Sequence, residues 1–113
     1  MQEDQKKFIE TIEQLCEQAH KTAKEHGWWE GDRSIGECIA LMHSELSEAL
    51  EYARKDPRAL SDHIDATGIE EEFADVLIRI FDYCGKNNLN LGNALVKKME
   101  YNKSRPYKHG KQF

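Results

Sequence analysis

The sequence contains no long hydrophobic run, and its longest uninterrupted apolar stretch is the five residues 38–42. A transmembrane helix needs about 20 consecutive apolar residues, so the sequence excludes one. The opening stretch, MQEDQKKFIETIEQ, is polar and lacks the apolar core of a secretion signal. We therefore expect a cytoplasmic protein with no membrane partner.

Cysteine and proline are scarce as well. The three cysteines, Cys16, Cys38 and Cys84, cannot all pair with one another and show no CxxC spacing. This pattern argues against a disulfide framework and against a zinc knuckle, and we interpret the three side chains as buried thiols. The chain also lacks the alternation of polar and apolar residues that is typical of strands, which favours an all-α protein.

An excess of positive charge is missing too. The chain has 16 Lys and Arg residues against 21 Asp and Glu residues, for a formal net charge of -5. Binding to nucleic acid polymers relies on cations that neutralise phosphates, so we expect no such partner. The charge is uneven, because residues 97–113 hold six basic residues whereas residues 37–51 hold four Glu and no Lys or Arg. An acidic centre and a basic end suit a molecule that holds cations and an anion together.

Four segments with helical periodicity are separated by Gly, Pro and polar residues. Two of them begin with a capping box, Ser34 with Glu37 and Thr67 with Glu70, in which side chains satisfy the free amides of a helix start. Residues 56–66 carry no sustained period and predict a connecting loop, and Pro106 ends the last helix. The expected helices cover residues 3–26, 34–55, 67–88 and 90–105.

We predict one all-α domain over residues 1–105, folded as a four-helix bundle-like protomer, with residues 106–113 as its basic C-terminal tail. A chain of 113 residues buries only roughly 65 % of the surface that its unfolded form exposes. The core of one chain is therefore small, and we expect oligomerisation to complete it.

Two pairs of acidic residues stand out on the two middle helices. Glu45 and Glu48 form one pair, and Glu72 and Asp75 form the other. In each pair the spacing is i, i+3, which puts both carboxylates on one face of a helix. We expect Glu71 to face water.

The phase of these pairs predicts where they meet. The apolar stripe of the second helix is centred on Ile35 and Ala53, and that of the third helix is centred on Phe73. Both acidic pairs are offset from their stripe in the same rotational sense and by a similar angle. If the two helices pack antiparallel through these stripes, all four carboxylates converge on one edge of the helix pair.

Four carboxylates brought together repel one another unless a cation lies between them. Oxygen ligands suit Mg²⁺ or Mn²⁺ rather than zinc, and Mg²⁺ often takes phosphate oxygens as further ligands. The pattern thus indicates a phosphorylated substrate. In a chain with 21 acids such pairs also arise by chance as solvated surface. A non-catalytic helical interaction or regulatory protein therefore stays open as the alternative, as does a di-iron bundle, for which only Glu17 and His20 have the required ExxH spacing.

Three stretches of the chain carry a family resemblance. They are HSELSEALE over residues 43–51, EEEFAD over residues 70–75 and NKSRPYKHGK over residues 102–111. Together they resemble the MazG-like branch of the all-α nucleoside triphosphate pyrophosphohydrolases. In longer family motifs a second acid precedes the first pair, and here Ser44 stands at that position.

The resemblance implies a reaction and a set of site residues. The reaction is Mg²⁺-dependent hydrolysis of a nucleoside or deoxynucleoside triphosphate to the monophosphate and pyrophosphate, in the house-cleaning of nucleotide pools. The metal-binding and catalytic residues would be Glu45, Glu48, Glu72 and Asp75. The family forms dimers or dimers of dimers, so a homodimer or homotetramer is implied, with the base pocket completed by a neighbouring subunit.

Further residues are candidates for substrate binding. The resemblance implies that Lys98 and Asn102 contact the nucleotide or its phosphates. The positive charge of Arg105, Lys108 and Lys111 suggests the same role for them. Trp28 and Trp29 lie in the loop before the second helix, where an indole ring either stacks on a nucleobase or closes the end of the bundle. We expect one tryptophan in each role.

Overall fold

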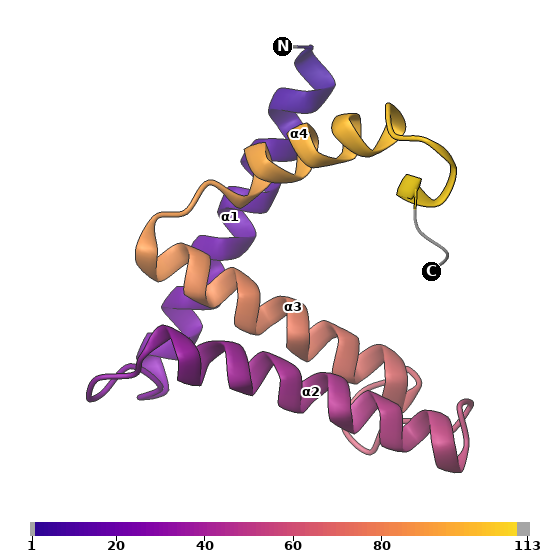
Figure 1. The fold of residues 1–113 in the computed structure, drawn as a ribbon. Coiled ribbons are helices and arrows are strands. Elements are labelled where there is room, and N and C mark those ends of the chain that lie inside the picture. Colours follow the sequence, from indigo (N-terminus) through magenta and orange to yellow (C-terminus); the bar gives the residue numbers. More distant parts are fainter. Residues whose placement is uncertain (1, 111–113) are drawn as a thin grey trace.

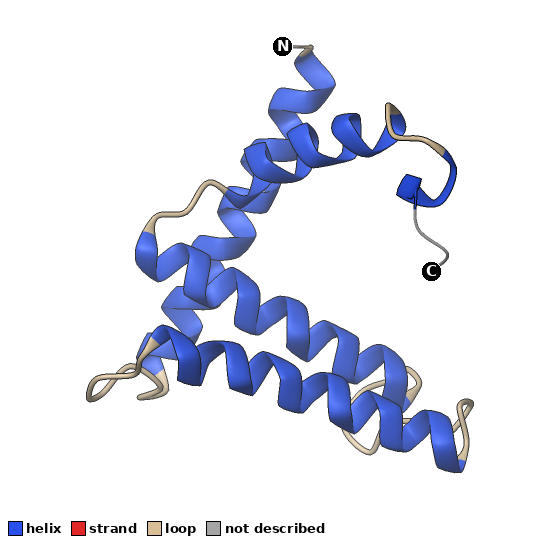
Figure 2. Ribbon diagram, in the orientation of Figure 1, coloured by secondary structure: helices blue, strands red, loops and turns tan. Residues whose placement is uncertain are grey.

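The protein is all-helical in the computed structural model, which describes residues 2–110 (Figures 1 and 2). The described residues form no strand, apart from an isolated bridge between Leu60 and Thr67 in the loop before the third helix. Each described helix is too short or too polar to traverse a lipid bilayer. The all-α prediction is confirmed. The helices are α1 (Glu3–Glu25), α2 (Ile35–Lys55), α3 (Gly68–Asn87), α4 (Leu91–Lys103) and the short 3₁₀ helix η1 (Tyr107–Gly110).

The capping residues predicted for the middle helices do begin them. The Thr67 hydroxyl accepts a hydrogen bond from the Glu70 amide at 3.1 Å, and the Glu70 carboxylate accepts one from the Thr67 amide at 3.0 Å. At the start of α2, Ser34 accepts a bond from the Glu37 amide at 3.1 Å. Here the Ser34 hydroxyl lies 3.4 Å from the Glu37 carboxylate, and no bond joins that carboxylate to the Ser34 amide. Of the two predicted boxes, therefore, the one at Thr67 is complete and the one at Ser34 is not.

Three glycines allow the close helix crossings of the fold. Helix α3 packs against both α1 and α2, and α4 packs against α1 (Figure 1). A Cβ atom on Gly68 would overlap the Tyr52 ring of α2, and one on Gly85 would overlap the backbone of Cys16 in α1. A Cβ on Gly92 would lie 3.0 Å from the Ile9 backbone. These crossings therefore depend on the missing side chain.

The described chain is open and has a very small core. Among the described residues, no large side chain is fully buried. Its radius of gyration is 16.5 Å, whereas a compact domain of this length has about 13 Å. The buried apolar residues are Cys16, Cys38, Ala49 and Cys84, which confirms the three cysteines as buried thiols.

Helices α2 and α3 lie side by side and antiparallel, but not through their apolar stripes (Figure 1). Ile35 and Phe73, the predicted stripe centres, are 57 % and 52 % exposed, while Glu45 and Glu72 are buried. The expected packing is therefore wrong. The acids occupy the contact between the helices, and the apolar stripes are left on the outside. Exposed members of the stripes are Ile35, Ile39, Leu46, Leu50, Phe73 and Leu77.

Candidate metal centre

Three carboxylates from two helices meet between α2 and α3. Glu45 comes from α2, and Glu72 and Asp75 come from successive turns of α3. One oxygen of each lies within 4.8 Å of the others. Glu45 is 9 % exposed and Glu72 is 6 % exposed. Glu48, one turn beyond Glu45, is exposed and borders Glu72.

Glu72 is the most constrained member of this acidic cluster. Its Oε2 atom is buried and has no hydrogen-bond partner among the described residues. The pKa of Glu72 is raised to about 8, first by burial and then by the neighbouring Glu48 and the charges of Glu45 and Asp75. Without a cation, this carboxyl group therefore tends to keep its proton at neutral pH.

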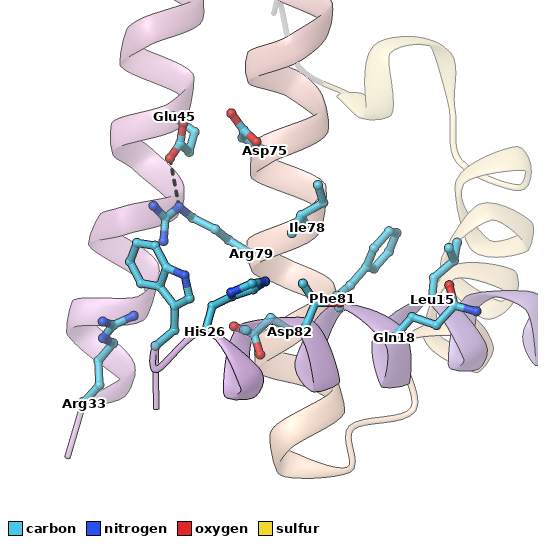
Figure 3. A pocket seen from close by; sticks show the side chains of 14 residues that line it. Leu15, Gln18, His26, Arg33, Glu45, Asp75, Ile78, Arg79, Phe81 and Asp82 are labelled. Atoms are coloured by element: carbon cyan, nitrogen blue, oxygen red, sulfur yellow. Dashed lines mark hydrogen bonds and ion pairs between the residues drawn. The ribbon is translucent and has the colours of Figure 1, made fainter. Parts of the chain in front are cut away.

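Arg79 supplies a positive charge that the sequence analysis missed. Its Nε atom donates a hydrogen bond to Oε1 of Glu45 at 2.9 Å, and the two side chains are 25 % and 12 % exposed (Figure 3). Burial raises the pKa of Glu45, and the hydrogen bond and charge of Arg79 partly offset this. The spacing along the sequence could have indicated this residue, because Arg79 follows Asp75 by four residues and so lies on the same face of α3.

The acidic cluster fits a magnesium or manganese ion. Its donors are all carboxylate oxygens, which these hard cations prefer. The unpartnered Oε2 atom of Glu72 is a buried acceptor that a bound cation would satisfy, and buried polar atoms without a partner are rare in proteins. Glu45, Glu72 and Asp75 can hold the ion, and Glu48 lies beside it.

A cleft of about 600 Å³ opens from this cluster, and Glu45 and Asp75 line one end of it (Figure 3). Its walls come from α1, α3 and the loop before α2. The apolar wall residues include Leu15, Ile78 and Phe81, and the polar ones include Gln18, His26 and Asp82. This volume and the mix of apolar walls with a few polar groups are typical of small-molecule sites.

The two tryptophans occupy different environments. Trp28 lines the cleft, and the guanidinium groups of Arg33 and Arg79 lie 5.7 and 5.6 Å from its ring centre. Trp29 is half-buried, and its Nε1 atom donates a hydrogen bond to Oδ1 of Asp82 at 2.8 Å. Asp82 was not among the predicted site residues, although it follows Asp75 by seven residues and so lies on the same face of α3.

A second hollow of about 410 Å³ lies on the other side of the cluster, next to Glu48 and Glu72. Glu71 lines it and accepts a hydrogen bond from the Ser61 hydroxyl at 2.6 Å. His63 Nδ1 lies 2.9 Å from the other oxygen of Glu71. The hydrogen bond from Ser61 is the largest cause of the lowered pKa of Glu71. The expectation that Glu71 faces water is therefore wrong, because the loop of residues 56–66 folds over it and leaves its side chain 16 % exposed.

Three of the substrate-binding candidates lie away from the acidic cluster in the described part of the chain. Helix α4 carries Lys98 and Asn102 and packs on α1, and neither the cleft nor the second hollow is lined by these residues or by Arg105. Lys98 and Arg105 instead lie 4.8 and 5.4 Å from the ring centre of Tyr101.

The last two basic candidates belong to the C-terminal end of the chain. Lys108 lies in η1, 5.7 Å from the ring centre of Tyr107. Lys111 falls outside the described residues.

Comparison of the chain with protein-family models, with curated proteins and with solved structures finds no match in any of the three.

Proposed function

We propose that the protein is a Mg²⁺-dependent nucleoside triphosphate pyrophosphohydrolase that releases a monophosphate and pyrophosphate and so clears unwanted nucleotides. The observation that carries this proposal is the buried, unpartnered Oε2 atom of Glu72 inside a carboxylate cluster at the end of a nucleotide-sized cleft. The MazG-like sequence motifs support the same reaction.

Each part of the site has a role in this proposal. Glu45, Glu72 and Asp75 hold Mg²⁺, or Mn²⁺ in its place. A bound metal of this kind neutralises phosphate charge and activates water. Glu48 is exposed at the cluster, which suits it to orient the attacking water. The cleft binds the nucleoside, with the phosphates directed toward the acids.

A second copy of the chain completes the site in this proposal. The exposed apolar stripes of α2 and α3 and the large radius of gyration support a homodimer or a homotetramer. Lys98, Asn102 and Arg105 lie on or just beyond α4, away from the acids of their own chain, so they would contact the phosphates across the subunit interface. We assign the same contact to Lys108 and Lys111 of the basic tail.

The decisive assay measures pyrophosphate and orthophosphate released from triphosphates in the presence of Mg²⁺. We expect pyrophosphate from the wild type and none from Glu72→Gln or Asp75→Asn, with unchanged helical content by circular dichroism. Glu10→Gln is the matched control, because Glu10 is an exposed acid on α1, and it should retain full turnover. Pyrophosphate release by both cluster variants would refute the roles given to these residues.

The exposed apolar stripes also favour a second candidate, a non-catalytic helical partner of other proteins. In that case neither Mg²⁺ nor nucleotide would change the melting temperature, and no triphosphate would be cleaved. A di-iron centre has less support, since His20 binds Asp82 at 3.0 Å and lies outside the acidic cluster. Iron content of the purified protein tests it.

A further inference from the structure

The end of the cleft opposite the acidic cluster holds one carboxylate in a fixed position. Oδ1 of Asp82 accepts a hydrogen bond from Trp29 Nε1 at 2.8 Å and lies 3.0 Å from His20 Nδ1. The Asp82 side chain is 15 % exposed and lines the cleft. Among the described residues, both of these contacts involve Oδ1. Oδ2 can therefore accept a hydrogen bond from a ligand.

The spacing between Asp82 and the acidic cluster suits a nucleotide. Asp82 and Asp75 lie on the same face of α3, seven residues and therefore about 10 Å apart along the helix. This is close to the span between the α-phosphate of a nucleotide and the far edge of its base. Ile78 and Phe81 lie between these two residues on α3 (Figure 3), and both line the cleft. Their apolar side chains suit contact with a flat ring.

The chemistry of Asp82 restricts the bases that fit. An ionised carboxylate only accepts hydrogen bonds, so it needs a donor from the base. The exocyclic amino groups of cytosine, on C4, and of adenine, on C6, are such donors and project from the ring. At the same positions uracil and thymine, and hypoxanthine and guanine, carry a carbonyl oxygen. That oxygen and Oδ2 would both be acceptors, so neither would gain a hydrogen bond.

We propose that this cleft selects bases with an exocyclic amino group on C4 of a pyrimidine or C6 of a purine, and that Oδ2 of Asp82 accepts the hydrogen bond from this group. The inference rests on the proposed function for the identity of the ligand as a nucleotide. Trp29 and His20 are positioning residues, because they hold the carboxylate through Oδ1. The preferred substrates are then cytidine and adenosine triphosphates or their deoxy forms.

The test uses nucleosides, because they carry no phosphate and need no metal to bind. The chain has two tryptophans, so the indole N–H region of an isotope-labelled protein has two signals, and that of Trp29 reports directly on Asp82. Cytidine and uridine differ at one position of the base, as do adenosine and inosine. We expect the amino member of each pair to shift the Trp29 signal and to bind at least about 30-fold more tightly, as one hydrogen bond to a charged group allows.

Asp82→Asn is the main variant, because its amide oxygen can still accept from Trp29 while its NH₂ group faces the cleft. Its preference should shift toward uridine and inosine. Trp29→Phe keeps Asp82 but frees the carboxylate, and should reduce the preference without reversing it. Asp65→Asn, an exposed loop acid, should behave as the wild type. Equal affinities within each pair, no shift with any nucleoside, or a cytidine preference that survives in Asp82→Asn would overturn the inference.

A parallel assay separates this inference from the proposed function. Equal kcat/KM for pyrophosphate release from CTP and UTP would refute base reading by Asp82 and leave the hydrolase function intact. Selective nucleoside binding without any pyrophosphate release would refute the hydrolase and support the base-reading cleft.

Discussion

The Nε atom of Arg79 lies 2.9 Å from Oε1 of Glu45, so one member of the acidic cluster already has a cation beside it. The contact with the guanidinium favours the charged form of Glu45, and a metal ion bound at the cluster would compete with Arg79 for this carboxylate. Oε2 of Glu72, in contrast, has no hydrogen-bond partner among the described residues.

Replacing Arg79 by Gln should have opposite effects on metal affinity and on metal-free stability. We expect Mg²⁺ to bind about tenfold more tightly, because the competing charge is gone, a change of ~1.4 kcal/mol. Without metal the variant should lose about 2 kcal/mol of unfolding free energy, since a hydrogen bond between charged groups is lost. Calorimetric Mg²⁺ titration and urea unfolding with a chelator measure the two effects. Arg79→Lys, which keeps the charge, is the control; weaker Mg²⁺ binding by the Gln variant would contradict the competition.

Metal-free stability should decrease as the pH rises from about 4.5 to about 8. The pKa of Glu72 is raised from 4.5 to about 8 by burial and by Glu48. Within this interval the folded protein keeps a proton that the unfolded chain has released, so each step upward in pH favours unfolding, and the loss levels off above pH 8. Burial raises the pKa of Glu45 in the same direction. Melting temperatures in chelator across this pH range test the prediction, and Glu72→Gln should flatten the profile.

Mg²⁺ binding should be coupled to the same proton. A cation can replace the proton at Glu72, so binding below pH 8 should release protons and become tighter as the pH rises. Calorimetry in two buffers of different ionisation enthalpy counts the released protons. An affinity that does not change between pH 6 and 8 would show that the metal does not contact this carboxyl group.

Gly68→Ala should separate α2 from α3 next to the acidic cluster. The new Cβ would overlap the Tyr52 ring, and overpacking of this kind costs about 1–3 kcal/mol. Stabilisation by Mg²⁺ should fall as well, because Glu45 and Glu72 belong to different helices. Gly36→Ala is the matched control within α2, where the nearest atom lies 3.7 Å away, and it should stabilise the protein by about 0.5 kcal/mol. Both are measured by urea unfolding; equal stability of the two variants would contradict the close contact.

Phe73→Glu should dissociate the proposed oligomer. A charge on the exposed apolar stripe would be buried without a partner at a subunit interface, so the measured mass should fall from a multiple of 13.1 kDa to that of one chain. Light scattering during gel filtration gives the mass. Leu60→Glu is the control, since Leu60 is 72 % exposed in the loop before α3. A wild type that is monomeric at micromolar concentration would remove the basis for a shared site.

Much of the secondary structure could be predicted because its signals are local. Ser34 and Thr67 begin helices through contacts with residues three positions on, and the i, i+3 spacing alone places Glu72 and Asp75 on one face. The end of α4 was predicted at residue 105 and lies at Lys103, where the amide and the hydroxyl of Ser104 both donate hydrogen bonds to the Tyr101 carbonyl and close the last turn.

Hydrophobic periodicity could not predict which side chains contact the residues of the site. Spacing gives the angle between the acids and the apolar stripes, but it does not say which of the two faces the neighbouring helix. Arg79 and Asp82 were missed for a related reason, since a charged residue on a helix face gains its role from what approaches it, here Glu45 and Trp29.

The sequence by itself determined four helices, their starts and the pairing of the acids along each helix, because these depend on neighbours within one or two turns. Only the tertiary structure decided that Glu45 and Glu72 are buried between α2 and α3 while Ile35 and Phe73 are exposed. The physical reason is that a single short chain cannot cover all its apolar surface, and close packing at Gly68 and Gly85 selects the faces that meet.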